Sequence, residues 1–287
     1  MRRLRLLRIA VVAMLLLGAG VSASAGELER IHGDLRRALL DLSERVDAKW
    51  KPELPVPAAA SSSPGSARVL VVAFTGGLVP KVHPISGVAM LTHRINGMGD
   101  DGVATLLFGR SDWRQAAAEV LKLAHSSPGS PGRLRQPLIV ACGHSLGANS
   151  MGKFARLLGQ SGLEVSLAVY IDAFPPGKAR VPANVACAVN FYQRAGLLKG
   201  IPVRGQSGLV ASAPARTTLL GSYLLKPPGQ RPKGEPRPFR LPLFEPHHLL
   251  AYDTRVQGYV CDSVRILLQL SAEEAGDGAR AAEIGAR

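Results

Sequence analysis

The chain has few aromatic residues and few cysteines, and both shortages narrow the classes of protein to consider. Phe, Trp and Tyr make up 5% of the 287 residues. No basic segment is interleaved with aromatic side chains, as a nucleic-acid-binding platform would require. The cysteines Cys142, Cys187 and Cys261 lie far apart and have no histidine companions, so the spacing of a zinc site is absent. We therefore expect no metal, no cofactor and no nucleic-acid partner.

Acidic residues are also scarce, at 21 against 35 lysines and arginines, which gives a formal net charge of +14. Four of these cations lie in the first eight residues, so the rest of the chain still carries about +10 (14 − 4). A basic protein outside the cytoplasm commonly meets anionic surfaces. We expect an anionic membrane surface or an envelope polymer among its partners.

The first 25 residues read as a secretory signal peptide. Four arginines precede an uncharged apolar stretch over residues 9–21, and Ala23-Ser24-Ala25 supplies the small residues that a signal peptidase reads. Cleavage is expected after Ala25, leaving the protein in the periplasm or secreted. The apolar stretch is short for a membrane span, and an uncleaved anchor over 9–21 is the alternative. In an oxidising compartment three cysteines leave at least one thiol free, and Cys187 could pair with Cys261.

Residues 26–50 predict an amphipathic helix, because apolar residues recur at spacings of three and four from Leu28 to Val46. The helix either packs on the body of the protein or forms a short dimerising coil. Residues 51–66 are rich in Pro, Ala and Ser and read as a linker. The segment 273–287 is polar and small, and we expect a flexible tail there.

Residues 67–272 predict one α/β domain. Apolar runs alternate with helical segments, which is typical of a parallel sheet covered on both faces. The strands expected are 69–74, 103–108, 138–142, 165–171 and 185–191, and the helices are 111–124, 148–158 and 253–270. The segment 194–241 breaks this rhythm with many prolines and basic residues. We interpret it as a lid over the site, with a short helix at Thr217 to Leu225.

The most informative motif is Gly143-His144-Ser145-Leu146-Gly147, between the strand ending at Cys142 and the helix starting at Ala148. This G-x-S-x-G pattern between a strand and a helix predicts a nucleophile elbow, in which a sharp turn exposes the serine hydroxyl. A glycine-rich turn with a buried or capping serine is the alternative.

A serine nucleophile needs a base and an orienting acid, which follow it in the chain order Ser, acid, His in this architecture. Of the seven histidines, only His247 and His248 follow Ser145 at a distance, and His144 should point away from the substrate. Asp172 ends an apolar strand at the carboxyl edge of the sheet, where catalytic groups gather. It is preferred to the other intervening acids, Glu164, Glu235 and Glu245. Asp172 lies one strand earlier than is common, but the later strand ends without a carboxylate.

The oxyanion of an acyl-transfer intermediate needs backbone donors. Leu146 N–H at the start of the elbow helix is one, and Gly77 N–H in Phe74-Thr75-Gly76-Gly77 is the expected second. A glycine turn without a catalytic part is the alternative for this loop.

With these residues in hand, the sequence from about 67 to 270 resembles the α/β-hydrolase superfamily, and within it bacterial lipase- or thioesterase-like proteins. The resemblance rests on the elbow and on five further segments: Phe74-Thr75-Gly76-Gly77, Val169-Tyr170-Ile171-Asp172, Val181-Pro182-Ala183-Asn184-Val185, Asn190-Phe191-Tyr192-Gln193 and the run from His247 to Val256. Its register favours His247 over His248 as the base. It implies an α/β-hydrolase fold and hydrolysis of esters or thioesters.

The sequence thus predicts an exported serine hydrolase acting on a small-molecule or lipid ester through an acyl-enzyme. Its expected groups are Ser145, Asp172, His247 (or His248), and the Gly77 and Leu146 N–H groups. The rival is a catalytically inactive hydrolase-fold protein that binds anionic envelope lipid or polymer.

Overall fold

A computed structural model describes most of the predicted domain and part of the segment before it. The described residues are 29–46, 64, 67–77, 86–126, 136–175, 177–195, 197–198, 201–202, 207–226 and 245–285. The predicted leader, and all of the predicted linker except residue 64, lie outside them. Within these ranges no helix is both long enough and apolar enough to cross a bilayer.

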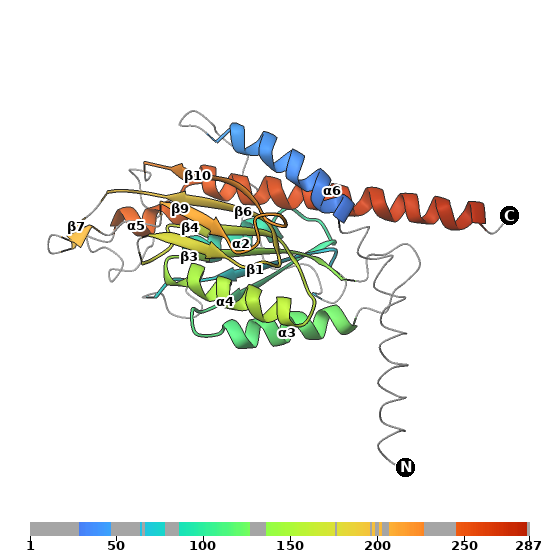
Figure 1. The fold of residues 1–287 in the computed structure, drawn as a ribbon, viewed down its shortest axis with the longest axis horizontal. Coiled ribbons are helices and arrows are strands. Elements are labelled where there is room, and N and C mark those ends of the chain that lie inside the picture. Colours follow the sequence, from blue (N-terminus) through green and yellow to red (C-terminus); the bar gives the residue numbers. More distant parts are fainter. Residues whose placement is uncertain are drawn as a thin grey trace, which may run out of the picture.

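The centre of the molecule is a six-stranded sheet whose neighbouring strands are all parallel, in the order β10-β6-β4-β3-β1-β2 (Figure 1). The strands are β1 (Val69–Phe74), β2 (Val103–Phe108), β3 (Leu138–His144), β4 (Val165–Ile171), β6 (Val185–Tyr192) and β10 (Thr218–Leu224). Four of them, β1, β3, β4 and β6, are buried along their whole length, as their continuous apolar runs require. The predicted class, a mostly parallel α/β sheet flanked by helices, is confirmed.

Helices cover both faces of this sheet because successive strand side chains point in opposite directions. Leu70 and Val72 of β1 pack with α3 (Trp113–Ser126) and α4 (Leu146–Gln160). Val69 and Val71 belong to the core on the other face, together with the helix over 29–44, α2 (Gly87–Asn96) and α6 (Thr254–Gly285). The result is a three-layer arrangement with the sheet between two helical layers.

The helix over residues 29–44 is part of the domain. Its apolar stripe, Ile31, Leu35, Leu39 and Leu42, is buried in the same core as the sheet. The Ser43 hydroxyl lies 3.0 Å from the Tyr259 hydroxyl of α6, and Figure 1 shows the two helices side by side. The residues that a dimerising coil would use therefore pack within the chain.

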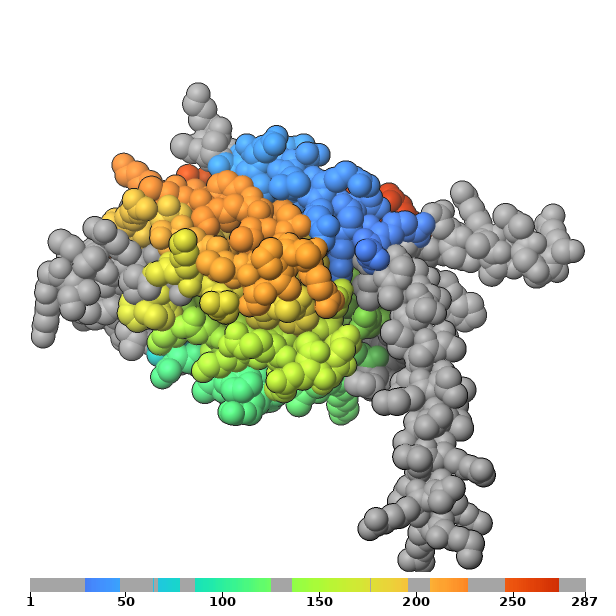
Figure 2. All heavy atoms as spheres, in the orientation of Figure 1, coloured from blue at the N-terminus to red at the C-terminus, as the bar shows by residue number. Residues whose placement is uncertain are grey.

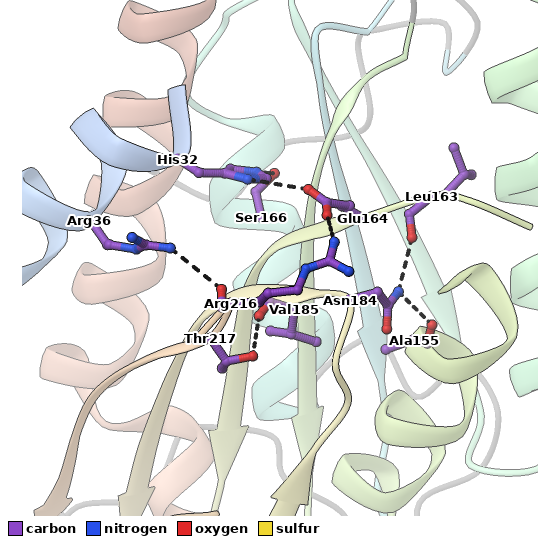
Figure 3. A network of polar contacts seen from close by, with 10 residues as sticks. All are labelled: His32, Arg36, Ala155, Leu163, Glu164, Ser166, Asn184, Val185, Arg216 and Thr217. Atoms are coloured by element: carbon purple, nitrogen blue, oxygen red, sulfur yellow. Dashed lines mark hydrogen bonds and ion pairs between the residues drawn. The ribbon is translucent and has the colours of Figure 1, made fainter. Parts of the chain in front are cut away.

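A polar network fastens this helix to the amino-terminal edge of the sheet (Figure 3). His32 contacts the Ser166 hydroxyl at 3.3 Å through Nε2 and the Glu164 carboxylate at 3.4 Å through Nδ1. Arg216 pairs with the same carboxylate, and its carbonyl oxygen accepts from Arg36. Glu164 therefore has a structural role at the edge opposite Ser145.

The segment predicted as a lid differs from the expectation in its described part. The prediction of a helix at Thr217 to Leu225 is wrong, because residues 218–224 form β10 at the edge of the main sheet. The sequence period of a helix cannot be told from that of a strand in so short an apolar run. The edge of β6 offers backbone hydrogen-bonding partners, and these favour the strand. Figure 2 shows this orange segment lying on the body, between the blue helix over 29–44 and the yellow-green strands and α4.

Two short additional sheets adjoin this region. β5 (Lys178–Val181) pairs with β9 (Gly208–Ala211), and β7 (Leu197–Leu198) pairs with β8 (Ile201–Pro202). The predicted lid residues 196, 199–200, 203–206 and 227–241 lie outside the described ranges. A lid over the site stays a prediction for those residues.

Two other expectations concern the end of the chain and the cysteines. α6 continues to Gly285, so the tail predicted as flexible from residue 273 is helical to that point, in keeping with its content of Ala and Glu. Cys142, Cys187 and Cys261 are all free and buried. Burial raises the pKa of each thiol to about 12, which makes the three side chains unreactive small hydrophobes.

Candidate active site

Ser145 occupies a sharp turn between β3 and α4. Its backbone has φ 57° and ψ −127°, and a positive φ is uncommon for a residue with a side chain. A Cβ added to Gly143 would come within 2.6 Å of the Ala148 Cα, and one added to Gly147 would overlap the carbonyl oxygens of Phe74 and Thr75. The two motif glycines are therefore required by the close approach of backbone, as expected for an elbow.

The structure brings the three predicted side chains into one hydrogen-bonded row. His247 Nε2 lies 2.8 Å from Ser145 Oγ, and His247 Nδ1 lies 2.6 Å from Asp172 Oδ2. All three are buried, with Asp172 fully inaccessible and Ser145 retaining 8% exposure. Because a carboxylate only accepts hydrogen bonds, Nδ1 carries the proton and Nε2 is left to accept the serine proton.

The histidine comes from α5 (Glu245–Leu249), a single short helix followed by the 3₁₀ turn η3 (Leu250–Tyr252). Of the adjacent pair, His247 rather than His248 faces the serine. The rings of the two lie 5.8 Å apart. Burial, and the positive charge that His247 can carry, lower the pKa of His248 to about 4. His248 is therefore a neutral neighbour of the row at physiological pH.

Asp172 is held in place by Gln193, which the sequence reasoning missed. The Gln193 backbone N–H donates to Oδ1 at 3.1 Å and its side-chain Nε2 donates to Oδ2 at 2.9 Å. Gln193 follows β6, the strand on which the acid would more commonly be found. The signal available in the sequence was its position: the first residue after β6, beside the strand end that carries Asp172.

The loop after β1 passes directly against the elbow. A Cβ added to Gly76 would lie 3.1 Å from the Ser145 Cβ, and one added to Gly77 would lie 2.6 Å from the Leu146 Cδ1. Leu146 is the first residue of α4, so its N–H is one of the donors that a helix leaves without an internal partner. The two predicted oxyanion residues, Gly77 and Leu146, are thus neighbours beside Ser145.

No group of three or more His, Cys, Asp or Glu side chains in the described part of the chain could hold a metal ion. A serine hydroxyl bonded to an oriented imidazole can attack an acyl carbon, and N–H groups beside it can hold the resulting negative oxygen.

The architecture is an α/β fold with a parallel six-stranded sheet between two helical layers. No protein-family model and no curated protein matches this chain. Two solved structures are similar to it: RedJ with a PEG molecule bound in its active site, and the RedJ thioesterase from the prodiginine biosynthetic pathway of Streptomyces coelicolor. They are 12% and 11% identical, with 63% and 61% of this chain and 90% of each of theirs covered, at a TM-score of 0.30.

Proposed function

We propose that this protein is a serine hydrolase that cleaves a carboxylic ester or thioester through an acyl-enzyme. The observation that carries the proposal is the continuous row Ser145–His247–Asp172, with separations of 2.8 and 2.6 Å. Both distances are within hydrogen-bonding range. The row lies at the carboxyl edge of a parallel sheet, where α/β proteins place their ligands.

Each residue has one role in the proposed reaction. His247 Nε2 takes the hydroxyl proton as Ser145 Oγ attacks the acyl carbon, and Asp172 holds the imidazole and stabilises its positive charge. The N–H groups of Gly77 and Leu146 bind the oxyanion. The intermediate then expels the alcohol or thiol, which leaves with the proton from His247. Water, activated in turn by His247, releases the acid and restores the serine.

We also propose that the substrate carries an anionic group. Arg110 follows β2 and Arg194 follows β6, each two strands away from the elbow strand β3 and about 10 Å from it at ordinary strand spacing. Both arginines are exposed. The Arg110 Cδ lies 3.7 Å from the position a Cβ of Gly77 would take, which places this cation beside the oxyanion loop. An acyl compound with a phosphate or carboxylate would meet a cation on either side of Ser145.

The proposed location remains that expected from the leader: exported to the periplasm or secreted. The net charge of +14 supports contact with an anionic membrane surface or envelope polymer. Fractionation of the full-length protein in its host, with N-terminal sequencing of the mature form, tests cleavage after Ala25 against retention as a membrane anchor.

Labelling with a fluorophosphonate tests the serine mechanism. The wild type is expected to be labelled, and Ser145→Ala to lose all labelling. Ser161→Ala is the matched control, because Ser161 is an exposed residue at the end of the same helix. A folded wild type that resists the reagent and hydrolyses no ester would overturn the proposal in favour of the inactive binding protein.

A paired substrate series tests the anionic group. Esters and thioesters of one acyl chain, with neutral or phosphorylated leaving groups, are compared in the wild type and in Arg110→Gln. We expect the wild type to favour the anionic member through a lower KM, and Arg110→Gln to lose that preference by about two- to fivefold, the size of one exposed charge contact. Equal KM values in the wild type would overturn the assignment.

A further inference from the structure

His144, the residue before the serine, makes a contact that its place in the motif does not explain. It ends β3 and its side chain is buried, with 3% exposed. Its Nε2 lies 2.9 Å from the backbone carbonyl oxygen of His247, a residue 103 positions later. The two rings lie 4.8 Å apart. The His144 side chain thus reaches the backbone of the base.

The direction of this hydrogen bond follows from chemistry. A carbonyl oxygen only accepts, so the proton between the two residues belongs to His144 Nε2. Burial first, and the neighbouring His247 and His248 next, lower the pKa of His144 well below its ordinary value. The ring is therefore neutral, has a single N–H, and uses it on the His247 carbonyl oxygen.

The other nitrogen of the ring faces the loop after β1. A Cβ on Gly76 would lie 3.3 Å from His144 Nδ1. The imidazole consequently fills the space between the oxyanion loop and α5. Three separate segments of the chain, the loop, the elbow and the short helix that carries the base, meet at this one side chain.

The base needs such support because α5 has only five residues. A helix of one turn contributes few internal hydrogen bonds and depends on tertiary contacts for its position. The His247 side chain is bonded to Ser145 and Asp172, whereas its backbone is held by the residue covalently joined to Ser145. Any movement of the elbow is therefore transmitted to the base through His144.

We propose that His144 is a positioning residue that sets the distance between His247 Nε2 and Ser145 Oγ by holding the His247 backbone. This inference rests on the proposed function. Misplacement of a catalytic group by about 1 Å can lower a rate by about 100-fold. Loss of the Nε2 donor should accordingly lower kcat, whereas the substrate-binding surface, and hence KM, should change little.

The test compares variants that keep or remove the donor. His144→Gln retains an N–H near the position of Nε2, and His144→Leu removes it at similar volume. We expect kcat on an activated ester to fall about 10- to 100-fold in His144→Leu, with KM within about threefold, and to be largely recovered in His144→Gln. His93→Leu, at a partly buried histidine of α2, is the matched control and should keep wild-type kcat.

Two outcomes would overturn the proposal: wild-type kcat in His144→Leu, or equal losses in His144→Leu and His144→Gln. If His144→Leu fails to fold, His144→Asn replaces it, since its shorter amide cannot reach the carbonyl oxygen. His144→Asn should then have a low kcat and His144→Gln a high one. Equal kcat values in the two variants would overturn the positioning role of His144.

A readout without substrate separates this inference from the proposed function. The His247 Nδ1 proton, shared with Asp172, gives a proton resonance that reports the geometry of the row. It should be sharp in the wild type and in His144→Gln, and broadened in His144→Leu. If the wild type hydrolyses nothing while the resonance responds in this way, the proposed function fails and the positioning role stands. An unchanged resonance in His144→Leu refutes the positioning role itself.

Discussion

Gln193 binds both carboxylate oxygens of Asp172, through its backbone N–H at 3.1 Å and its side-chain amide at 2.9 Å. The side-chain oxygen of Gln193 accepts in turn from the backbone N–H of Ala195, at 2.6 Å. Because Asp172 is fully buried, an unpaired carboxylate there would be costly. The Gln193 amide therefore replaces the hydrogen bonds that water would give the carboxylate. It also holds in place Asp172 Oδ2, the oxygen that faces His247.

Replacing Gln193 with Leu should weaken both the fold and the proposed reaction. A hydrogen bond to a charged group contributes about 1.5–3 kcal/mol, so the free energy of unfolding should fall by about 2 kcal/mol. The kcat should fall by about tenfold as Asp172 gains freedom to turn. Urea unfolding and ester kinetics measure the two effects. Gln115→Leu on the exposed face of α3 is the control, and wild-type values for both quantities in Gln193→Leu would contradict the prediction.

Substitution of His247 and of His248 should have very different effects on kcat. His247→Gln should lower kcat at least 1000-fold, because among the described residues this is the imidazole that lies within hydrogen-bonding distance of Ser145 Oγ. His248→Gln should keep kcat within about fivefold of wild type. Steady-state kinetics and the rate of fluorophosphonate labelling provide the measurements. The reverse pattern would reassign the base to His248.

Two glycines of α4 should respond to alanine in opposite directions. At Gly147 a Cβ would overlap the backbone oxygens of Phe74 and Thr75, which cannot move without shifting β1. Gly147→Ala should cost about 1–3 kcal/mol of stability and abolish labelling. At Gly152 the nearest atom is a terminal nitrogen of Arg156 at 4.0 Å, so Gly152→Ala should stabilise by about 0.5–1 kcal/mol. Thermal unfolding of the pair checks both signs.

Stability should decline as the pH falls below about 6.5. Burial and His247 depress the pKa of His248 from its ordinary value of 6.5 to about 4. Between these two pH values His248 is protonated in the unfolded chain but neutral in the folded chain. Above pH 6.5 His248 is neutral in both states and lowers no stability. Between pH 6.5 and pH 4 the free energy of unfolding therefore falls progressively, by up to about 3 kcal/mol. His144, whose pKa is also lowered, adds to the trend.

Urea unfolding at pH 7.5 and pH 4.5 measures this loss. His248→Gln cannot titrate and should show a smaller difference between the two pH values than the wild type. An identical difference in both proteins would show that other groups control the acid sensitivity.

The buried strands were the most predictable part of the fold. Residues 69–74 and 165–171 form strands with the bounds that their apolar runs suggest, because a strand buried on both faces needs hydrophobic residues throughout. β10 was misread as a helix because it is an edge strand whose state is decided by its neighbour β6. α2 was not predicted at all, although Ser86 caps it by accepting from the Ala89 N–H; its mixed sequence carries a weak apolar pattern.

In the site, too, some residues could be predicted from the sequence and others could not. The chain order of nucleophile, acid and base was enough to choose Ser145, Asp172 and His247, and the structure brings these three into contact, while their catalytic roles stay predictions. The His144 contact could not be predicted, and Gln193 offered only its position after β6, because a neutral amide or imidazole has no signature of its own. Their importance depends on which residue faces them after folding, across separations of 21 and 103 positions.

The helix over residues 29–44 and α6 close the same face of the sheet, joined by the contact between Ser43 and Tyr259. The first and last helices of the described chain therefore bury one shared core. A growing chain that has not yet reached α6 leaves Ile31, Leu35 and Leu39 without their final partners. Long-range pairings of this kind slow folding. The domain should complete its fold only once α6 has been synthesised, a delay that would keep it open for passage across a membrane if the predicted leader directs it there.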